Sequence, residues 1–172
     1  QLSPDPALGQ AWVVPRKGRA EFQLGWKGCL ALAYRSPLVR AVRYNVVGKA
    51  DRFVWRDGRD YHLEHEPVEE GWPTKLDDVR AAWCIIETTR GGDIPRVMYR
   101  AEIERHKARG AGSQPAWATD PSPMALKTVI GDACRRGPFE GETARAFGLD
   151  HLGELGKGQP KAEEEFLDVE FT

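Results

Sequence analysis

Hydrophobic and polar residues alternate with a period of two near the start of the chain, the spacing of a half-buried strand. Ala20, Phe22 and Leu24 alternate with polar neighbours, and a short apolar run, Trp12-Val13-Val14, stands before Pro15. A turn at residues 16–18 separates the two runs. The pattern therefore predicts a β-hairpin.

From Trp26 the spacing of apolar residues changes to three and four. Trp26, Cys29, Leu30 and Ala33 form one stripe, which predicts a helix that ends at Ser36-Pro37. Beyond it, β-branched and aromatic residues predict strands at 38–47, 51–56, 60–63, 81–89 and 96–99. Asp57-Gly58 is a turn signal that joins the second and third of these strands into a hairpin.

The second half of the chain favours helices. We expect a polar helix at 100–109, an irregular loop at 110–121, a helix at 123–136 and a short helix at 142–147. Strands followed by helices predict an α+β fold with a mostly antiparallel sheet packed by helices. We expect a core domain at 1–148 and an acidic, flexible tail at 149–172.

The helix expected at 123–136 has two unlike sides. Ser122 before Pro123 predicts an N-cap followed by proline in the first turn. One side carries an apolar stripe made of Leu126, Val129, Ile130 and Ala133. The other side is small and cationic and consists of Lys127, Gly131, Cys134 and Arg135. This second side either lies against an anionic partner or is a solvated surface with two cations.

The length and composition describe one domain of ordinary size. The chain has 172 residues, 41% of them hydrophobic, and no apolar run approaches the ~18 residues that span a membrane. The three cysteines lie far apart without metal-ligand spacing. We expect them to pack in the core of a protein from a reducing compartment.

Charge is distributed in blocks, although the net charge is only -1. Residues 1–59 hold 11 Lys and Arg against 4 Asp and Glu, and residues 94–136 hold 8 against 4. Residues 60–93 and 137–172 each hold 3 against 9. Either the basic blocks come together in a positive groove, or basic and acidic blocks pair within the monomer.

Signals of catalysis are weak in this sequence. On a strand, His62, Glu64 and Glu66 would share one face and His65 the other, so an exposed polar hairpin is favoured over a metal site. The run Gly25-Trp26-Lys27-Gly28 lacks the spacing of a phosphate-binding loop. The pattern disfavours an ATP-driven or hydrolytic enzyme, and we expect no catalytic residues.

Nucleic-acid binding has more support, because single-strand binders combine cations with aromatic faces. The candidate phosphate contacts are Lys27, Arg35, Arg40, Arg43, Lys127, Arg135 and Arg136. The candidate stacking residues are Trp26, Tyr44 and Trp117, each with core packing as the alternative. Core packing is favoured for Trp26, which lies on the apolar stripe of its helix.

Two segments share one pattern, with a lysine, a small residue and an arginine four positions apart. These are Lys27-x3-Ala31-x3-Arg35 and Lys127-x3-Gly131-x3-Arg135. At helical spacing each set lies along one face. We hypothesise that both faces line one groove and hold a phosphate backbone above the small residue, although such a recurrence also arises by chance.

Several motifs in order resemble the RecT family of phage single-strand annealing proteins and, more distantly, the Red-beta proteins. They are Leu2-Ser3-Pro4, Gln10-Ala11-Trp12-Val13-Val14-Pro15, Phe22-Gln23-Leu24-Gly25-Trp26-Lys27-Gly28, Leu32-Ala33-Tyr34-Arg35-Ser36, His65-Glu66-Pro67, Trp117-Ala118-Thr119-Asp120, Met124-Ala125 and Lys127-Thr128-Val129-Ile130. The similarity covers roughly residues 2–136. With the residue pattern it predicts DNA contacts at Gln23, Trp26, Lys27, Arg35, Arg43, Trp117, Lys127, Thr128, Arg135 and Arg136.

The resemblance implies that the protein coats single-stranded DNA and anneals complementary strands without ATP, with Mg²⁺ only as a counterion of the DNA. It also implies self-association into rings or filaments, a phage 5′-to-3′ exonuclease as partner, and a cytoplasmic place in a bacterial host. Family members usually have further N-terminal helices, which we expect to be absent from a chain that starts at Gln1. A passive single-strand coating protein is the main alternative, and a metal-dependent nuclease is a distant third.

The chain departs from the family pattern at two places. Relatives commonly carry basic residues where this chain has Gly131-Asp132, and Arg135-Arg136 is expected to compensate one turn later. Pro37 replaces a small, flexible residue.

Overall fold

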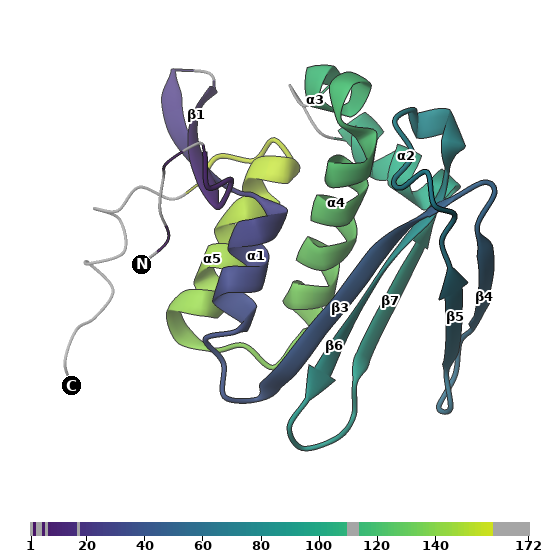
Figure 1. Cartoon of the computed structure of the whole chain (residues 1–172). Coiled ribbons are helices and arrows are strands. Elements are labelled where there is room, and N and C mark those ends of the chain that lie inside the picture. Colours follow the sequence, from purple (N-terminus) through teal and green to yellow (C-terminus); the bar gives the residue numbers. More distant parts are fainter. Residues whose placement is uncertain (1, 3–4, 6, 17, 110–113, 160–172) are drawn as a thin grey trace.

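The described part of the chain forms seven strands in three antiparallel sheets and five α-helices (Figure 1). The computed structural model describes residues 2, 5, 7–16, 18–109 and 114–159. The predicted turn residue Lys17, part of the predicted loop at 110–113 and the tail from 160 onward lie outside the described residues. The strands are Ala11–Arg16 (β1), Arg19–Leu24 (β2), Val39–Gly48 (β3), Arg52–Arg56 (β4), His62–Glu66 (β5), Val79–Thr88 (β6) and Ile94–Tyr99 (β7). The helices are Trp26–Ala33 (α1), the short η1 at Leu76–Asp78, Arg100–Arg109 (α2), Gln114–Thr119 (α3), Pro121–Arg136 (α4) and Gly141–Glu154 (α5).

The central sheet has the strand order β3-β6-β7, with every neighbour antiparallel. Its register places Tyr44 opposite Cys84 and Cys84 opposite Arg96. The strands β1 and β2 form one separate hairpin, and β4 and β5 form another. The predicted α+β class with antiparallel strands packed by helices is confirmed, and so are both hairpins.

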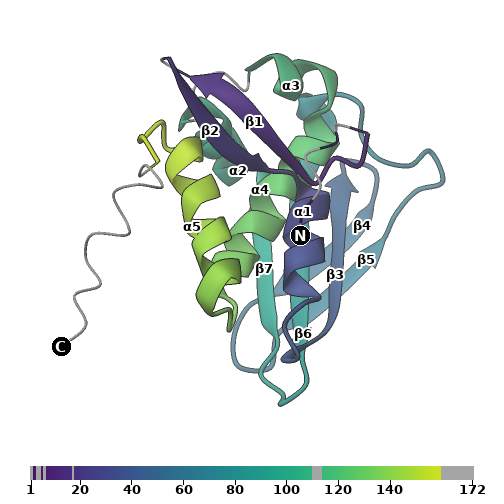
Figure 2. The ribbon, with the colours of Figure 1, turned by 90° about the vertical axis from the view of Figure 1, so that its left-hand side faces the viewer.

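The sheet is covered on both faces by different kinds of structure. Helix α4 packs directly on β3, β6 and β7, and α1 and α5 pack against α4 (Figures 1 and 2). The other face carries the β4–β5 hairpin through a small cluster around Val47, Phe53, Ala81 and Val97. None of the helices in the described part of the chain is long and apolar enough to cross a membrane.

The start of α4 differs from the prediction. The helix begins at Pro121, and α3 occupies much of the segment expected to be an irregular loop. Asp120 is the N-cap and makes no side-chain cap, so the predicted N-cap role of Ser122 is wrong. The Ser122 hydroxyl instead donates to the Pro73 carbonyl oxygen at 2.6 Å, because the residue lies inside the first turn and faces a neighbouring loop.

Helix α5 is longer than the short helix predicted at 142–147. It continues to Glu154, and the predicted division between residues 148 and 149 therefore falls inside a helix. The Asp150 side chain is buried and accepts a hydrogen bond from the Leu24 backbone N–H at 2.7 Å. The Gln159 side chain accepts from the Phe22 N–H and donates to the Phe22 carbonyl oxygen, so this part of the chain is hydrogen-bonded to β2.

Candidate nucleic-acid interface

Aromatic side chains from four segments lie around the place where the β1–β2 hairpin, α1 and β3 meet, and two of them, Trp26 and Tyr44, are in ring contact. The rings of Trp26 and Tyr44 lie 5.5 Å apart, and the Lys27 ammonium lies 5.7 Å from the centre of the Trp26 ring. The Trp72 indole N–H donates to the side-chain oxygen of Asn45 at 2.7 Å. We call Trp12, Trp26, Tyr44 and Trp72 the aromatic row.

Glycines bring Trp12 to one end of this row. A Cβ on Gly25 would lie 2.6 Å from the Trp12 ring, and one on Gly28 would lie 2.0 Å from the Gln10 carbonyl oxygen. Both contacts are closer than real side chains allow, so only glycine lets the start of β1 approach α1 here. The two glycines of the Gly25-Trp26-Lys27-Gly28 motif therefore serve close packing.

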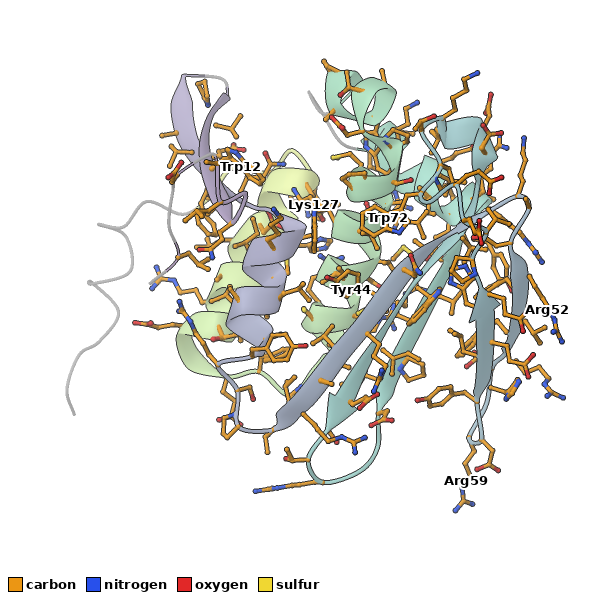
Figure 3. All side chains as sticks on the ribbon, in the orientation of Figure 1. Trp12, Tyr44, Arg52, Arg59, Trp72 and Lys127 are labelled. Carbon is orange, nitrogen blue, oxygen red and sulfur yellow. The ribbon has the colours of Figure 1, made fainter. Side chains whose placement is uncertain are left out.

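The row combines ring faces with one exposed cation. Trp72 is 41% exposed, Lys27 is exposed, and Trp12, Trp26 and Tyr44 are half-buried. Burial raises the pKa of the Tyr44 phenol, so this group stays neutral at neutral pH. Figure 3 shows Trp12, Tyr44 and Trp72 between the β1–β2 hairpin and the sheet. Half-exposed aromatic faces beside a cation suit stacking of nucleobases and contact with a phosphate.

Lys127 does not lie on an exposed face. Its side chain is 9% exposed, and its ammonium lies 3.8 Å from Asp150 and 3.9 Å from Glu154, both on α5. The prediction of a solvated cationic side on this helix is wrong. Helices α1 and α5 pack against α4, and residues on both sides of α4, Gly131 and Cys134 included, are buried.

Three more predicted contacts gather with Lys127 around one small cavity. Gln23, Trp117 and Thr128 line a space of about 50 Å³ together with Arg109 and Glu154. Trp117 is 3% exposed and belongs to the core, which is the alternative that the sequence left open. The Thr128 hydroxyl donates to the Met124 carbonyl oxygen at 2.9 Å inside its own helix. These side chains support the fold at this end of the molecule.

Asp132 joins the arginines of α4 to the sheet. Its carboxylate accepts from Arg96 at 2.5 Å, Arg136 at 3.0 Å and Arg135 at 3.2 Å. Burial alone would raise the pKa of Asp132, but the hydrogen bond from Arg96 and the three positive charges lower it. Asp132 thus holds Arg135 and Arg136 in ion pairs.

The two similar Lys–small–Arg segments do not line one groove. Arg35 lies beyond the last residue of α1, Ala33, and is exposed. Gly131 is buried, and Lys127 and Arg135 both turn toward Glu154 of α5. A phosphate backbone has no access to the space above Gly131, so the hypothesis that the two Lys–small–Arg faces line one groove is wrong.

Arg40 lies near the start of β3, whereas Arg43 lies in the middle of this strand, next to Tyr44. Arg40 and Arg43 both pair with Glu87, and their side chains are 65% and 67% exposed. The backbone of Arg43 is thus close to the Trp26–Tyr44 pair, whereas its side chain is held by Glu87. The alternative of pairing between charge blocks is also confirmed for these arginines and for Lys127 with α5.

The histidines of β5 have separate surroundings. His62 lies 2.8 Å from Glu64 on the outer face, whereas His65 donates to Asp51 at 2.9 Å and accepts from the Trp83 indole at 3.1 Å. The prediction that His65 faces away from the other polar residues of this strand is confirmed.

Sequence reasoning missed Trp12 and Trp72 as members of the row. Trp72 stands between Gly71 and Pro73 in a polar, turn-rich segment, where an exposed tryptophan is a signal in itself. Trp12 was assigned only to a strand, and its place beside Gly25 depends on tertiary contacts.

Comparison with known proteins places the chain in a family. The model of the RecT family matches residues 1–157. The chain belongs to the RecT family. In this chain the motif Gly25-Trp26-Lys27-Gly28 forms the N-cap and first turn of α1, where Gly25 packs against the Trp12 ring and Lys27 lies over the Trp26 ring.

Two relatives support the assignment to the RecT family. Protein RecT of Escherichia coli (strain K12) is 31% identical over 159 residues, which are 87% of this chain and 57% of that protein. The uncharacterized protein YqaK of Bacillus subtilis (strain 168) is 30% identical over 127 residues, which are 73% of this chain and 43% of that protein. The chain thus spans about half the length of these relatives.

Proposed function

We propose that the chain binds single-stranded DNA along the aromatic row and anneals complementary strands without ATP. The observation that carries this proposal is the row itself, which links ring faces and Lys27 at the glycine motif of a RecT family member. Stacking on aromatic faces does not depend on sequence, because every base has a π-face. Phosphate contacts by lysine and arginine are also sequence-independent.

The energy of annealing comes from base pairing, so the proposed reaction needs no nucleotide hydrolysis and no cofactor, with Mg²⁺ only as a counterion. A row with one exposed and three half-buried rings holds some bases while leaving others free to pair. Assembly into rings or filaments and cooperation with a 5′-to-3′ exonuclease belong to the same proposal and rest on the family alone.

Binding to a labelled oligonucleotide at increasing salt tests the interface. We expect the affinity for the oligonucleotide to fall steeply as salt is added. Lysine and arginine release counterions from the phosphates when they bind, and added salt opposes this release. Trp72→Ala should weaken binding by about 1–3 kcal/mol, the usual value of one stacked base. Lys27→Glu should weaken binding and reduce the salt slope by about one.

Arg105→Glu is the matched control, because Arg105 is exposed on α2, which packs on β6, β7 and α4, and the substitution makes the same charge change. A salt-independent affinity, or equal losses for Lys27→Glu and Arg105→Glu, would contradict the proposed interface. Mixing complementary oligonucleotides without ATP then separates annealing from passive coating, since a coating protein binds but does not speed duplex formation.

A further inference from the structure

Exposed arginines from five separate segments gather at the end of the sheet opposite the aromatic row. Arg35 follows α1, Arg40 begins β3, Arg59 lies at the tip of the β4–β5 hairpin, Arg90 lies in the β6–β7 turn, and Arg136 ends α4. We call these five residues the arginine end. Figure 3 shows Arg59 at the hairpin tip, far from Trp12 and Trp72.

The length of α4 sets the distance between the two regions. The first turn of α4 contacts the loop of Trp72 through Ser122 and Pro73, and Arg136 is its last residue. Sixteen residues at about 1.5 Å each separate Arg136 from the Trp72 loop by about 24 Å. Arg40 is four residues along β3 from Tyr44, about 13 Å at the rise of a strand. The arginine end therefore lies beyond the aromatic row along α4 and β3.

Two open clefts shape the surface of the arginine end. One has a volume of 590 Å³ and is lined by Arg40, Arg59, Tyr61 and the half-buried Asp93. The Asp93 carboxylate accepts from the Tyr61 hydroxyl at 3.2 Å and from the Thr88 N–H at 3.1 Å. The other has a volume of 380 Å³ and is lined by Arg90 and Arg136. The Gly91-Gly92 turn lies between them and borders both, and its missing side chains leave the backbone open.

The charge that faces solvent at this end is mainly positive. Glu87 pairs with Arg40 but is only 14% exposed, and Asp132 pairs with Arg136 but is only 16% exposed. The side chains of Arg40 and Arg136 themselves are 65% and 58% exposed. In the described residues Arg35, Arg59 and Arg90 have no ion pair, while Asp57 and Asp60 are the exposed acids of the hairpin tip.

We propose that the arginine end binds the phosphate backbone of a second nucleic-acid segment while the aromatic row holds the first. Guanidinium groups suit phosphates because they bind them in a forked, bidentate manner. No ring of the aromatic row lies at this end, so the second segment keeps its bases free for pairing. The inference rests on the proposed function, since it requires a first strand on the row.

Arg59→Glu/Arg90→Glu in the full chain tests this surface, because both residues are exposed and outside any ion pair in the described residues. The complex with one labelled oligonucleotide receives a second, non-complementary oligonucleotide with another label, and energy transfer between the labels reports the ternary complex. We expect the affinity for the second oligonucleotide to fall about tenfold or more, and that for the first to change less than about twofold. Lys49→Glu/Arg105→Glu, with the same charge change on exposed residues elsewhere, should alter neither affinity by more than about twofold.

Each other outcome overturns part of the scheme in a distinguishable way. If the wild-type chain binds one oligonucleotide but no second, or if the Arg59/Arg90 variant binds the second as the wild type does, the arginine end is not a second site. If the same variant loses the first and second oligonucleotides equally, the two regions form one continuous site. If the wild type binds no oligonucleotide at all, the proposed function itself fails.

Discussion

Lys127 shows how strongly the surroundings of one residue decide its role. At the level of the helix it is a cation opposite an apolar stripe, and in the folded chain it is the buried partner of Asp150 and Glu154. Burial and the charge of Asp150 raise the pKa of Glu154, while Lys127 and Arg135 oppose that rise. Removing Lys127 would leave two buried carboxyl groups side by side.

We therefore expect Lys127→Met to lower the free energy of unfolding by roughly 3 kcal/mol, as when one partner of a buried ion pair is removed. Lys27→Met is the matched control and should change stability by less than about 0.5 kcal/mol, because Lys27 is exposed. Urea unfolding at neutral pH measures both. Equal stability of the two variants would contradict the structural role of Lys127.

At the scale of elements, the β4–β5 hairpin is attached to the sheet by a buried polar chain. The Asp51 carboxylate accepts from His65, from the Gly48 N–H at 2.7 Å and from the Val68 N–H at 3.1 Å, and His65 accepts from Trp83 of β6. Burial alone would raise the pKa of Asp51. The hydrogen bonds outweigh burial, and the largest lowering effect is that of His65, so the pKa of Asp51 is lowered. The folded chain thus favours the ionised carboxylate.

This attachment predicts a pH dependence of stability. A carboxyl group with a lowered pKa stabilises the fold above its unfolded value of 3.8, and that contribution is lost as pH falls through the folded value. Asp51→Asn should cost about 2 kcal/mol at pH 7, and the difference from wild type should shrink below pH 3.8. Denaturant unfolding from pH 3 to 7 measures the difference, and one that stays constant over this range would refute the assignment.

At the scale of the whole molecule, one core joins parts of the chain that are far apart in sequence. Cys29 of α1, Cys84 of β6 and Cys134 of α4 are all buried within it, as their apolar settings predicted. Burial raises the pKa of all three thiols, that of Cys84 to about 12. The thiols therefore stay protonated and unreactive at pH 8.

We expect an aromatic disulfide reagent to label none of the three cysteines in the native chain at pH 8 and all of them in denaturant. The labelling rate should follow the unfolding equilibrium, so Lys127→Met should speed it and Lys27→Met should not. Rapid labelling of one thiol in the native wild type would show that its element opens independently of the core.

The sequence by itself determined most of the elements and the family, but not α3 or the full length of α5. Alternation and turn signals placed both hairpins, the apolar stripes placed α1 and α4, and ordered motifs indicated the RecT family, because these properties reside in neighbouring residues. Which residues reach solvent was decided only by the tertiary structure. Lys127 and Arg135 are equally suited to a surface and to an interface, and Glu154 of α5 pairs with both through contacts that no local pattern contains. The same holds for the meeting of Trp72 with Asn45, which joins a loop to a strand far from it in sequence.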